Sequence, residues 1–253
     1  MGSKVFDIKD KVVCIIEARM ASTRLPGKVL KDIGGRNSLE HIVKRIKSLG
    51  NISEICLATT TRTEDQVIIE LAKSFGIKHY RGSEHDVLSR VLGAAEMLSA
   101  EIIVEITGDC PFVDPIMVDQ YIEIMKTNNL DYVSNNIIST YPDGFDVQVF
   151  LTEALKKSSS MATTREEREH VTMHIRQNPQ IFKTLNIVAP KPYRYPEISV
   201  TLDTKEDLEV LRLIAHHFFD VDSPSHMQII DFLLANPGIS QINSGIARKG
   251  FGI

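Results

Sequence analysis

The stretch Val12-Val13-Cys14-Ile15-Ile16 indicates the fold class, because an unbroken apolar run is typical of a strand that is covered on both faces. Similar short runs rich in β-branched residues follow in the first half of the chain, at 54–59, 77–80, 101–107 and 131–134. Helical patterns alternate with them, at 38–49, 64–75, 86–98 and 115–127. This alternation predicts βαβ units around a mostly parallel sheet in an α/β fold.

The pattern changes after residue 134. The expected elements there are strands at 147–150, 181–188 and 197–202, and helices at 164–176, 205–218 and 225–234. The tail after Pro237 shows no periodicity. We interpret residues 1–253 as a single domain with four parts. Residues 11–134 form the main α/β part and residues 135–196 form a smaller β-containing lobe. The chain then returns to the main part at 197–243 and ends in a tail at 244–253.

The composition excludes several classes of protein. Hydrophobic residues make up 43% of the 253 residues and charged residues 25%, as in a globular domain with a sizeable core. No apolar run approaches the ~20 residues that span a bilayer, so no membrane partner is expected. The net charge of −4, the absence of Trp and the aromatic content of 6% argue against a nucleic-acid partner.

The three cysteines lie far apart in the sequence, at Cys14, Cys56 and Cys110. An odd number without CxxC spacing argues against a disulfide framework and against a zinc site. This cysteine usage suits a reducing compartment, so we expect a cytoplasmic protein.

The segment that follows the first strand is rich in positive charge. It reads Glu17-Ala-Arg-Met-Ala-Ser-Thr-Arg-Leu-Pro-Gly-Lys28, and between residues 18 and 36 five cations face one acid: Arg19, Arg24, Lys28, Lys31 and Arg36 against Asp32. Small residues let backbone N–H groups approach a ligand closely, and the cations neutralise its charge. The segment is neither a P-loop nor a GxGxxG motif, but it suits a polyphosphate.

Two aspartates also follow expected strands. Asp109 lies in Thr107-Gly-Asp-Cys-Pro111, and Asp203 lies in Ser199-Val-Thr-Leu-Asp203. A carboxylate at the end of a parallel strand can hold Mg²⁺ against phosphate oxygens. Each segment alone also fits a solvated loop, an Asx turn or a helix N-cap. Their combination favours a site for a nucleotide and a metal.

These motifs resemble those of the cytidylyltransferases that activate acidic sugars, such as the CMP-Kdo and CMP-sialic acid synthetases. The resemblance runs in order from about Lys11 to Asn243 and is nearest to the branch named after spore coat polysaccharide biosynthesis protein F. It includes Arg81-Gly-Ser-Glu-His-Asp-Val-Leu88, Tyr141-Pro-Asp-Gly-Phe-Asp-Val147 and Glu169-His-Val-Thr172. The chain departs from the CMP-Kdo enzymes at Glu17, where they usually carry Pro.

The resemblance implies a Rossmann-like nucleotidyltransferase fold with a dimerising β-lobe, and therefore a homodimer. It implies a Mg²⁺-dependent reaction in which CTP and an acidic sugar give a CMP-sugar and pyrophosphate, in surface polysaccharide or glycan synthesis. Residues 11–134 then form the nucleotide-binding half, and residues 135–196 form the acceptor or dimerisation lobe.

The resemblance also implies roles for single residues. Arg19, Lys28, Asp109 and Asp203 are the expected catalytic residues, and Asp109 and Asp203 are the expected metal ligands. The expected nucleotide-binding residues are Ala18, Arg19, Ser22, Arg24, Lys28, Thr59, Arg81, Ser83 and Asp109. The expected acceptor-binding residues are Asp143, Asp146, Glu169 and His170.

Some features of the second half have simpler interpretations. His170 and His174 would share one face of the expected helix 164–176, yet no HExxH glutamate accompanies them, so zinc is disfavoured. Arg168 and Arg176 on that helix are candidates to bind the carboxylate of an acidic sugar.

Three alternatives stay open at this point: a glycosyltransferase of related fold, a nucleotidyltransferase that uses GTP or another NTP, and a non-catalytic nucleotide-sensing protein. Glycosyltransferases typically hold their metal with a DxD pair, and Asp109-Cys110-Pro111 does not have this pattern. The identity of the acceptor sugar also stays open, because a few pocket side chains determine it.

Overall fold

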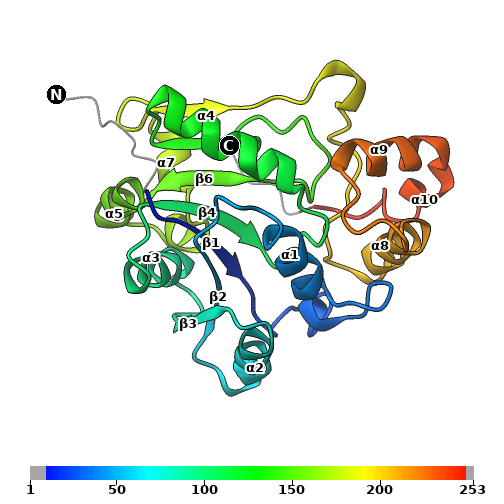
Figure 1. Cartoon of the computed structure of the whole chain (residues 1–253), viewed down its shortest axis with the longest axis horizontal. Coiled ribbons are helices and arrows are strands. Elements are labelled where there is room, and N and C mark those ends of the chain that lie inside the picture. Colours follow the sequence, from blue (N-terminus) through cyan, green and yellow to red (C-terminus); the bar gives the residue numbers. More distant parts are fainter. Residues whose placement is uncertain (1–9, 249–253) are drawn as a thin grey trace.

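The computed structural model describes residues 10–248. Its centre is a single seven-stranded sheet with the strand order β3-β2-β1-β4-β6-β5-β7 (Figure 1). The C-terminal helices α8, α9 and α10 gather at one end of the molecule, and α3 and α5 lie toward the other end. The terminal segments 1–9 and 249–253, which include the end of the expected tail, lie outside the described residues.

The sheet is mostly parallel. Four strands of the first half are mutually parallel: β1 (Val12–Glu17), β2 (Glu54–Thr60), β3 (Lys78–Gly82) and β4 (Ile102–Thr107). β6 (Gln148–Leu151) runs antiparallel to both β4 and β5 (Tyr132–Ser134), and β5 pairs in parallel with β7 (Thr184–Asn186). The expected mixed α/β sheet is therefore confirmed.

Ten α-helices are present in residues 10–248. They are α1 (Ser38–Ile46), α2 (Gln66–Ser74), α3 (Val87–Met97), α4 (Pro115–Asn128), α5 (Thr152–Met161), α6 (Arg165–Glu169), α7 (Met173–Gln177), α8 (Lys205–His217), α9 (His226–Ala235) and α10 (Pro237–Gln241). Side chains at their N-caps start several of them, because these side chains accept hydrogen bonds from otherwise unpaired N–H groups: Asn37, Asp86, Asp114, Thr164, Thr204 and Ser225. No helix within this part of the chain is long and apolar enough to span a bilayer.

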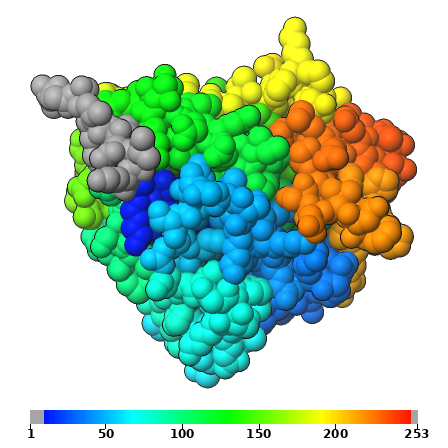
Figure 2. Space-filling model, in the orientation of Figure 1, coloured from blue at the N-terminus to red at the C-terminus, as the bar shows by residue number. Residues whose placement is uncertain are grey.

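The hydrophobic core has two parts. The larger part surrounds β1, whose residues Val12–Ile16 are almost completely buried, as expected for a strand that is covered on both faces. The smaller part lies beneath α8 and α9, around Phe145, Val200 and Leu202. Figure 2 shows these C-terminal helices packed directly against the segment that leads into α1, where Arg212 donates a hydrogen bond to the carbonyl of Asp32. All three cysteines are buried and free.

The order of the first four strands fixes the position of the site. The chain builds β2 and β3 on one side of β1 and then crosses to place β4 on the other side. A crevice forms at such a change of direction, outside the carboxyl ends of the two diverging strands. The segment after Glu17 and the segment after Thr107 therefore meet at one edge of the sheet, where the N–H of Gly108 donates to the carbonyl of Glu17 at 2.7 Å.

The expected helix at 164–176 is wrong in part. It is divided into α6 and α7, and the chain turns at His170, where the N–H of Met173 donates to its carbonyl at 2.6 Å. The turn buries Val171 and Thr172, and the Thr172 hydroxyl donates to Gln148 Oε1 at 2.5 Å. Burial of these β-branched side chains outweighs continuation of the helix, so His170 and His174 do not share the face of one continuous helix.

The expected strand at 197–202 is also wrong. Its only strand-like pairing in the described residues is a single bridge between Asp143 and Ser199. The backbone of this segment instead forms hydrogen bonds with two loops. Val200 N–H donates to the carbonyl of Asp143 at 2.7 Å, and Leu202 N–H donates to the carbonyl of Asp109 at 2.8 Å. Two α-helices were not expected at all, namely α5 and the short α10.

Candidate active site

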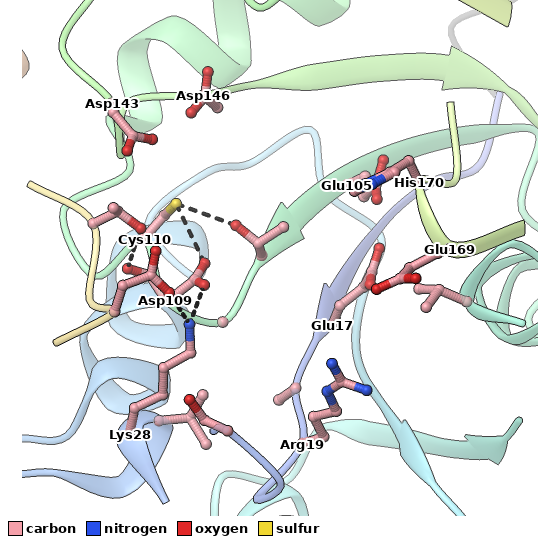
Figure 3. A pocket seen from close by; sticks show the side chains of 18 of the residues that line it. Glu17, Arg19, Lys28, Glu105, Asp109, Cys110, Asp143, Asp146, Glu169 and His170 are labelled. Atoms are coloured by element: carbon pink, nitrogen blue, oxygen red, sulfur yellow. Dashed lines mark hydrogen bonds and ion pairs between the residues drawn. The ribbon is translucent and has the colours of Figure 1, made fainter. Parts of the chain in front are cut away.

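A cleft of about 410 Å³ lies at the carboxyl ends of β1 and β4. It is lined by segments from across the chain: 17–19, 21–24, 28–29, 107–110, 143, 146, 169–170, 201, 203 and 248 contribute, together with Val87, Arg90, Glu105, Asn136 and Gln148. Figure 3 shows Asp143 and Asp146 on one side of the cleft, with Arg19 and Lys28 across from them. The topology thus brings into one cleft residues that are more than 200 positions apart in the sequence.

An ion-pair cluster occupies the part of the cleft between the two strand-end loops. Lys28 Nζ lies 2.6 Å from Asp109 Oδ2 and 2.8 Å from Asp203 Oδ1. The second oxygen of Asp203 is 2.7 Å from a guanidinium nitrogen of Arg24. The two aspartates expected as metal ligands therefore converge on one point, although 94 positions separate them, and the Lys28 ammonium stands at that point.

This cluster shifts the pKa values of its members. Burial alone raises the pKa of Asp109 and lowers that of Lys28, because it penalises the charged form of each group. The opposite charges outweigh burial: Lys28 holds the pKa of Asp109 below its usual range, and Asp109 and Asp203 hold that of Lys28 above its own. Both groups are therefore charged throughout the neutral range.

Two glycines allow the loops of the cluster to approach each other. Gly27 adopts φ = +65°, a left-handed conformation that precedes a short 3₁₀ helix at Lys28–Leu30. A Cβ atom on Gly108 would lie 2.7 Å from the carbonyl oxygen of Glu17, so a side chain there would push the β4 loop away from β1. The loop after β1 is also anchored to the residue that precedes α2, since Met20 N–H donates to Asp65 Oδ1 at 2.7 Å.

A second pair of aspartates lines the opposite side of the cleft. Burial and the charge of Asp146 raise the pKa of Asp143 to about 7, despite the opposing charge of Arg248. Burial raises the pKa of Asp146 to about 6, and Asp109 contributes, while a hydrogen bond from Gly144 acts against the shift. Gly144 has φ = +106°, and a Cβ atom there would lie 2.7 Å from the backbone of Val200 and Thr201. The turn therefore requires glycine.

A buried polar group that was not expected from the sequence also lines the cleft. Glu105 on β4 is almost fully buried and accepts a hydrogen bond from Gln148 Nε2 at 3.1 Å. Burial and the neighbouring Glu17 carboxyl raise its pKa well above the usual range. Glu17 in turn lies 3.5 Å from Arg90, whose side chain is only 3% exposed. An acid within an apolar strand and an arginine within a helix gave no motif that could have revealed this group.

Arg248 is a second residue that was not expected. It is the last residue that the structure describes, and its side chain lines the cleft. Its guanidinium forms a two-point ion pair with the buried Asp207, at 2.7 and 3.0 Å. Asp207 also accepts hydrogen bonds from the N–H groups of Asp203 and Thr204. Arg248 therefore stabilises the turn that presents Asp203 to the cleft.

The remaining expected site residues fall into two groups. Ala18, Arg19, Ser22, Glu169 and His170 line the same cleft as the ion-pair cluster. Thr59, Arg81 and Ser83 lie outside its lining, and the Arg81 guanidinium donates to the carbonyls of Thr60 and Arg62. Their nucleotide-binding role stays a prediction.

The two arginines that were candidates for a sugar carboxylate also lie outside the lining of the cleft. Arg168 donates to the carbonyls of Ser159 and Ala162 at 2.8 and 3.0 Å. This arginine therefore joins α5 to α6. The charge of Arg176 opposes the upward pKa shifts of Glu105 and Asp146.

Two known proteins match nearly the whole chain in sequence. An uncharacterized protein of Methanocaldococcus jannaschii is 39% identical over 242 residues, which cover 95% of this chain and 98% of that protein. Spore coat polysaccharide biosynthesis protein SpsF of Bacillus subtilis is 31% identical over 231 residues, which cover 89% of this chain and 95% of that protein.

Two solved structures have the same fold. A cytidylyltransferase from Leptospira borgpetersenii superimposes with a TM-score of 0.87 and 31% identity, covering 94% of this chain and 99% of that chain. CMP:2-keto-3-deoxy-manno-octonic acid synthetase complexed with CTP gives a TM-score of 0.61 at 19% identity, over 82% of this chain and 99% of that chain. The family model described as cytidylyltransferase matches residues 13–223. The chain belongs to the cytidylyltransferase family and is a nucleotidyltransferase enzyme.

Proposed function

We propose that the enzyme transfers CMP from CTP to a hydroxyl group of an acidic sugar and releases pyrophosphate, with Mg²⁺ as cofactor. The observation that carries the proposal is the convergence of Lys28, Arg24, Asp109 and Asp203 at the carboxyl ends of β1 and β4. CTP is favoured because the family is that of the cytidylyltransferases and because a synthetase of the same fold binds CTP. The relation to SpsF favours a role in polysaccharide synthesis.

The loop from Ala18 to Lys28 binds the triphosphate in this proposal. Arg19, Arg24 and Lys28 all line the cleft, so three cations of one loop face the ligand. Attack at the α-phosphorus concentrates negative charge on the non-bridging oxygens and on the leaving pyrophosphate. Cations that are held in place before the reaction stabilise this charge without further reorganisation.

The residues present fit a divalent metal. Two carboxylates already converge on one cation, and oxygen donors are the ligands that Mg²⁺ prefers. Asp109 and Asp203 would hold the ion between them. When bound, Mg²⁺ supplies Lewis-acid stabilisation of the phosphate oxygens.

The acceptor occupies the side of the cleft that faces the lobe 135–196. Asp143, Asp146, Glu169 and His170, which all belong to this lobe, line the cleft. A carboxylate with a pKa near neutrality can take the proton of an attacking hydroxyl at physiological pH, and Asp143 and Asp146 have such pKa values, about 7 and about 6. Either aspartate can therefore orient the acceptor hydroxyl and receive its proton. We further propose that the enzyme acts as a cytoplasmic homodimer through this lobe.

The test is pyrophosphate release from each of the four NTPs with Mg²⁺ and a panel of acidic sugars. We expect release with CTP and at least one acidic sugar, and none without a sugar. Release with GTP instead of CTP would contradict the nucleotide assignment. Consumption of a nucleotide sugar without pyrophosphate release would indicate a glycosyltransferase.

A further inference from the structure

We propose that Lys28 occupies the metal position in the nucleotide-free enzyme, so that the divalent metal binds together with the nucleotide and not before it. This inference rests on the proposed function, because it concerns the order in which metal and nucleotide enter the same cleft. It assigns Lys28 a second task besides phosphate binding: it keeps the free enzyme from holding a metal ion.

The contacts of Lys28 are those of a bound cation. Its ammonium contacts one oxygen of Asp109 and one of Asp203, at 2.6 and 2.8 Å. The other carboxylate oxygen of Asp203 forms an ion pair with the Arg24 guanidinium at 2.7 Å. Two carboxylates therefore face two cations, and the cluster is electrically balanced without a metal. A divalent ion that enters alone must displace both cations from their partners.

Displacement by metal alone is costly because Lys28 has little access to water. Its side chain is 14% exposed, and those of Asp109 and Asp203 are 24% and 20% exposed. An ammonium pushed off the carboxylates would stay partly desolvated beside a divalent ion of the same sign. Within residues 10–248, moreover, no group of three or more His, Cys, Asp and Glu side chains is arranged to hold a metal.

The nucleotide removes this cost. Lys28 and Arg24 belong to the loop that we propose binds the triphosphate, so phosphate oxygens offer both cations new partners of higher charge. The carboxylates become available at the moment the cations transfer to the phosphates. The nucleotide also brings the additional oxygen ligands that Mg²⁺ needs to complete its coordination. Binding of metal and nucleotide is therefore positively coupled through these two side chains.

The experiment measures binding of Mn²⁺, a paramagnetic substitute for Mg²⁺, to the nucleotide-free protein by EPR titration. We expect weak binding to the wild type and at least roughly tenfold tighter binding to Lys28→Met, in which the competing charge is gone. Lys28→Arg keeps the charge and should bind Mn²⁺ as weakly as the wild type. Lys31→Met is the matched control, because Lys31 is exposed and does not line the cleft, and its Mn²⁺ affinity should not change.

Two outcomes would overturn the inference. One is Mn²⁺ binding to Lys28→Met that is no tighter than to the wild type, with thermal melting showing that the variant is folded. The other is equally tight binding to Lys28→Arg and Lys28→Met, which would make the effect one of shape and not of charge. A failure of the proposed function is distinguishable, because it shows as absent pyrophosphate release in the wild type, whereas the Mn²⁺ titration needs neither CTP nor a sugar.

Discussion

Lys28 is the residue at which the electrostatics of the cleft can be tested by a single substitution. If its loop binds the triphosphate, Lys28→Ala should lower CTP affinity about tenfold to a hundredfold, the value of one charge-assisted contact. Isothermal titration calorimetry in the presence of Mg²⁺ measures this, with Lys31→Ala as the exposed control from the same segment. Unchanged CTP affinity in folded Lys28→Ala would remove this loop from the nucleotide site.

Asp143 makes stability depend on pH. Its pKa is raised from about 3.9 in the unfolded chain to about 7 in the folded protein, so the folded state binds more protons between these values. The stability that this group contributes is present below pH ~4 and lost as the pH rises through ~7. Asp143→Asn avoids the loss, so we expect it to be more stable than the wild type at pH 8, by up to about 4 kcal/mol. The gain should vanish at pH 4.

Chemical denaturation at the two pH values measures this difference. The control is Asp222→Asn, since Asp222 is exposed and the Lys44 ammonium holds its pKa below the usual range. That variant should show no gain at pH 8. An equal gain for Asp143→Asn at both pH values would contradict the assigned pKa shift.

Single site residues could be predicted from the sequence where a motif follows a strand. Asp109 and Asp203 stand in loops, and Lys28 begins the short 3₁₀ helix that follows the loop after β1. Outside the long regular elements, a charged side chain signals a ligand more than a core position. Glu105 and Arg90 could not be identified in this way, because each lies inside a regular element whose other residues form the core. The contribution of Arg248 depends on a contact with Asp207, 41 positions away, and no local pattern encodes such a contact.

At the scale of secondary structure, Asp114 joins two helices. One carboxylate oxygen of Asp114 caps α4 by accepting a hydrogen bond from Ile116 N–H at 2.9 Å. The other oxygen accepts a hydrogen bond from the backbone N–H of His226, at the start of α9, and lies 2.6 Å from Nδ1 of the His226 ring. Asp114 is 1% exposed, so its removal leaves buried donors without partners. We expect Asp114→Ala to lower the free energy of unfolding by about 3 kcal/mol.

Urea denaturation followed by circular dichroism measures this loss. Asp119→Ala is the matched control, because Asp119 lies on the exposed face of the same helix and contacts only the side chain of Asn51 in the described hydrogen bonds. Its effect should stay within about 0.5 kcal/mol. Similar losses for both variants would show that the joint between α4 and α9 adds nothing beyond helix propensity.

Strands and helices of the first half were predictable because each has its own periodicity. The elements of the second half were less predictable, because contacts with distant segments determine where they begin and end. The break after α6 arises from burial of Thr172 against Gln148, and residues 197–202 pair with loops in place of a strand. α5 contains Ser158, Ser159 and Ser160, and its buried face includes small polar residues, so its apolar pattern is weak.

At the scale of the whole molecule, the change of direction between β1 and β4 creates one crevice, and the C-terminal segment completes it. Asn243 donates to the carbonyl of Ser199 and to Asp207, so the chain after α10 returns to the turn that carries Asp203. The two aspartates proposed to hold the metal come from loops 94 positions apart in the sequence, so the metal site forms only when both parts of the fold are assembled.

The most direct test of this account is the rate of pyrophosphate release by Asp109→Ala, by Asp203→Ala and by the double variant, each with CTP, Mg²⁺ and the acidic sugar found in the panel. If the two carboxylates hold one ion as a unit, each single variant should lose kcat/KM by about a thousandfold, and the double variant should be little worse. Losses that multiply in the double variant, or full activity of the wild type in EDTA, would contradict a metal site shared by these two strand-end loops.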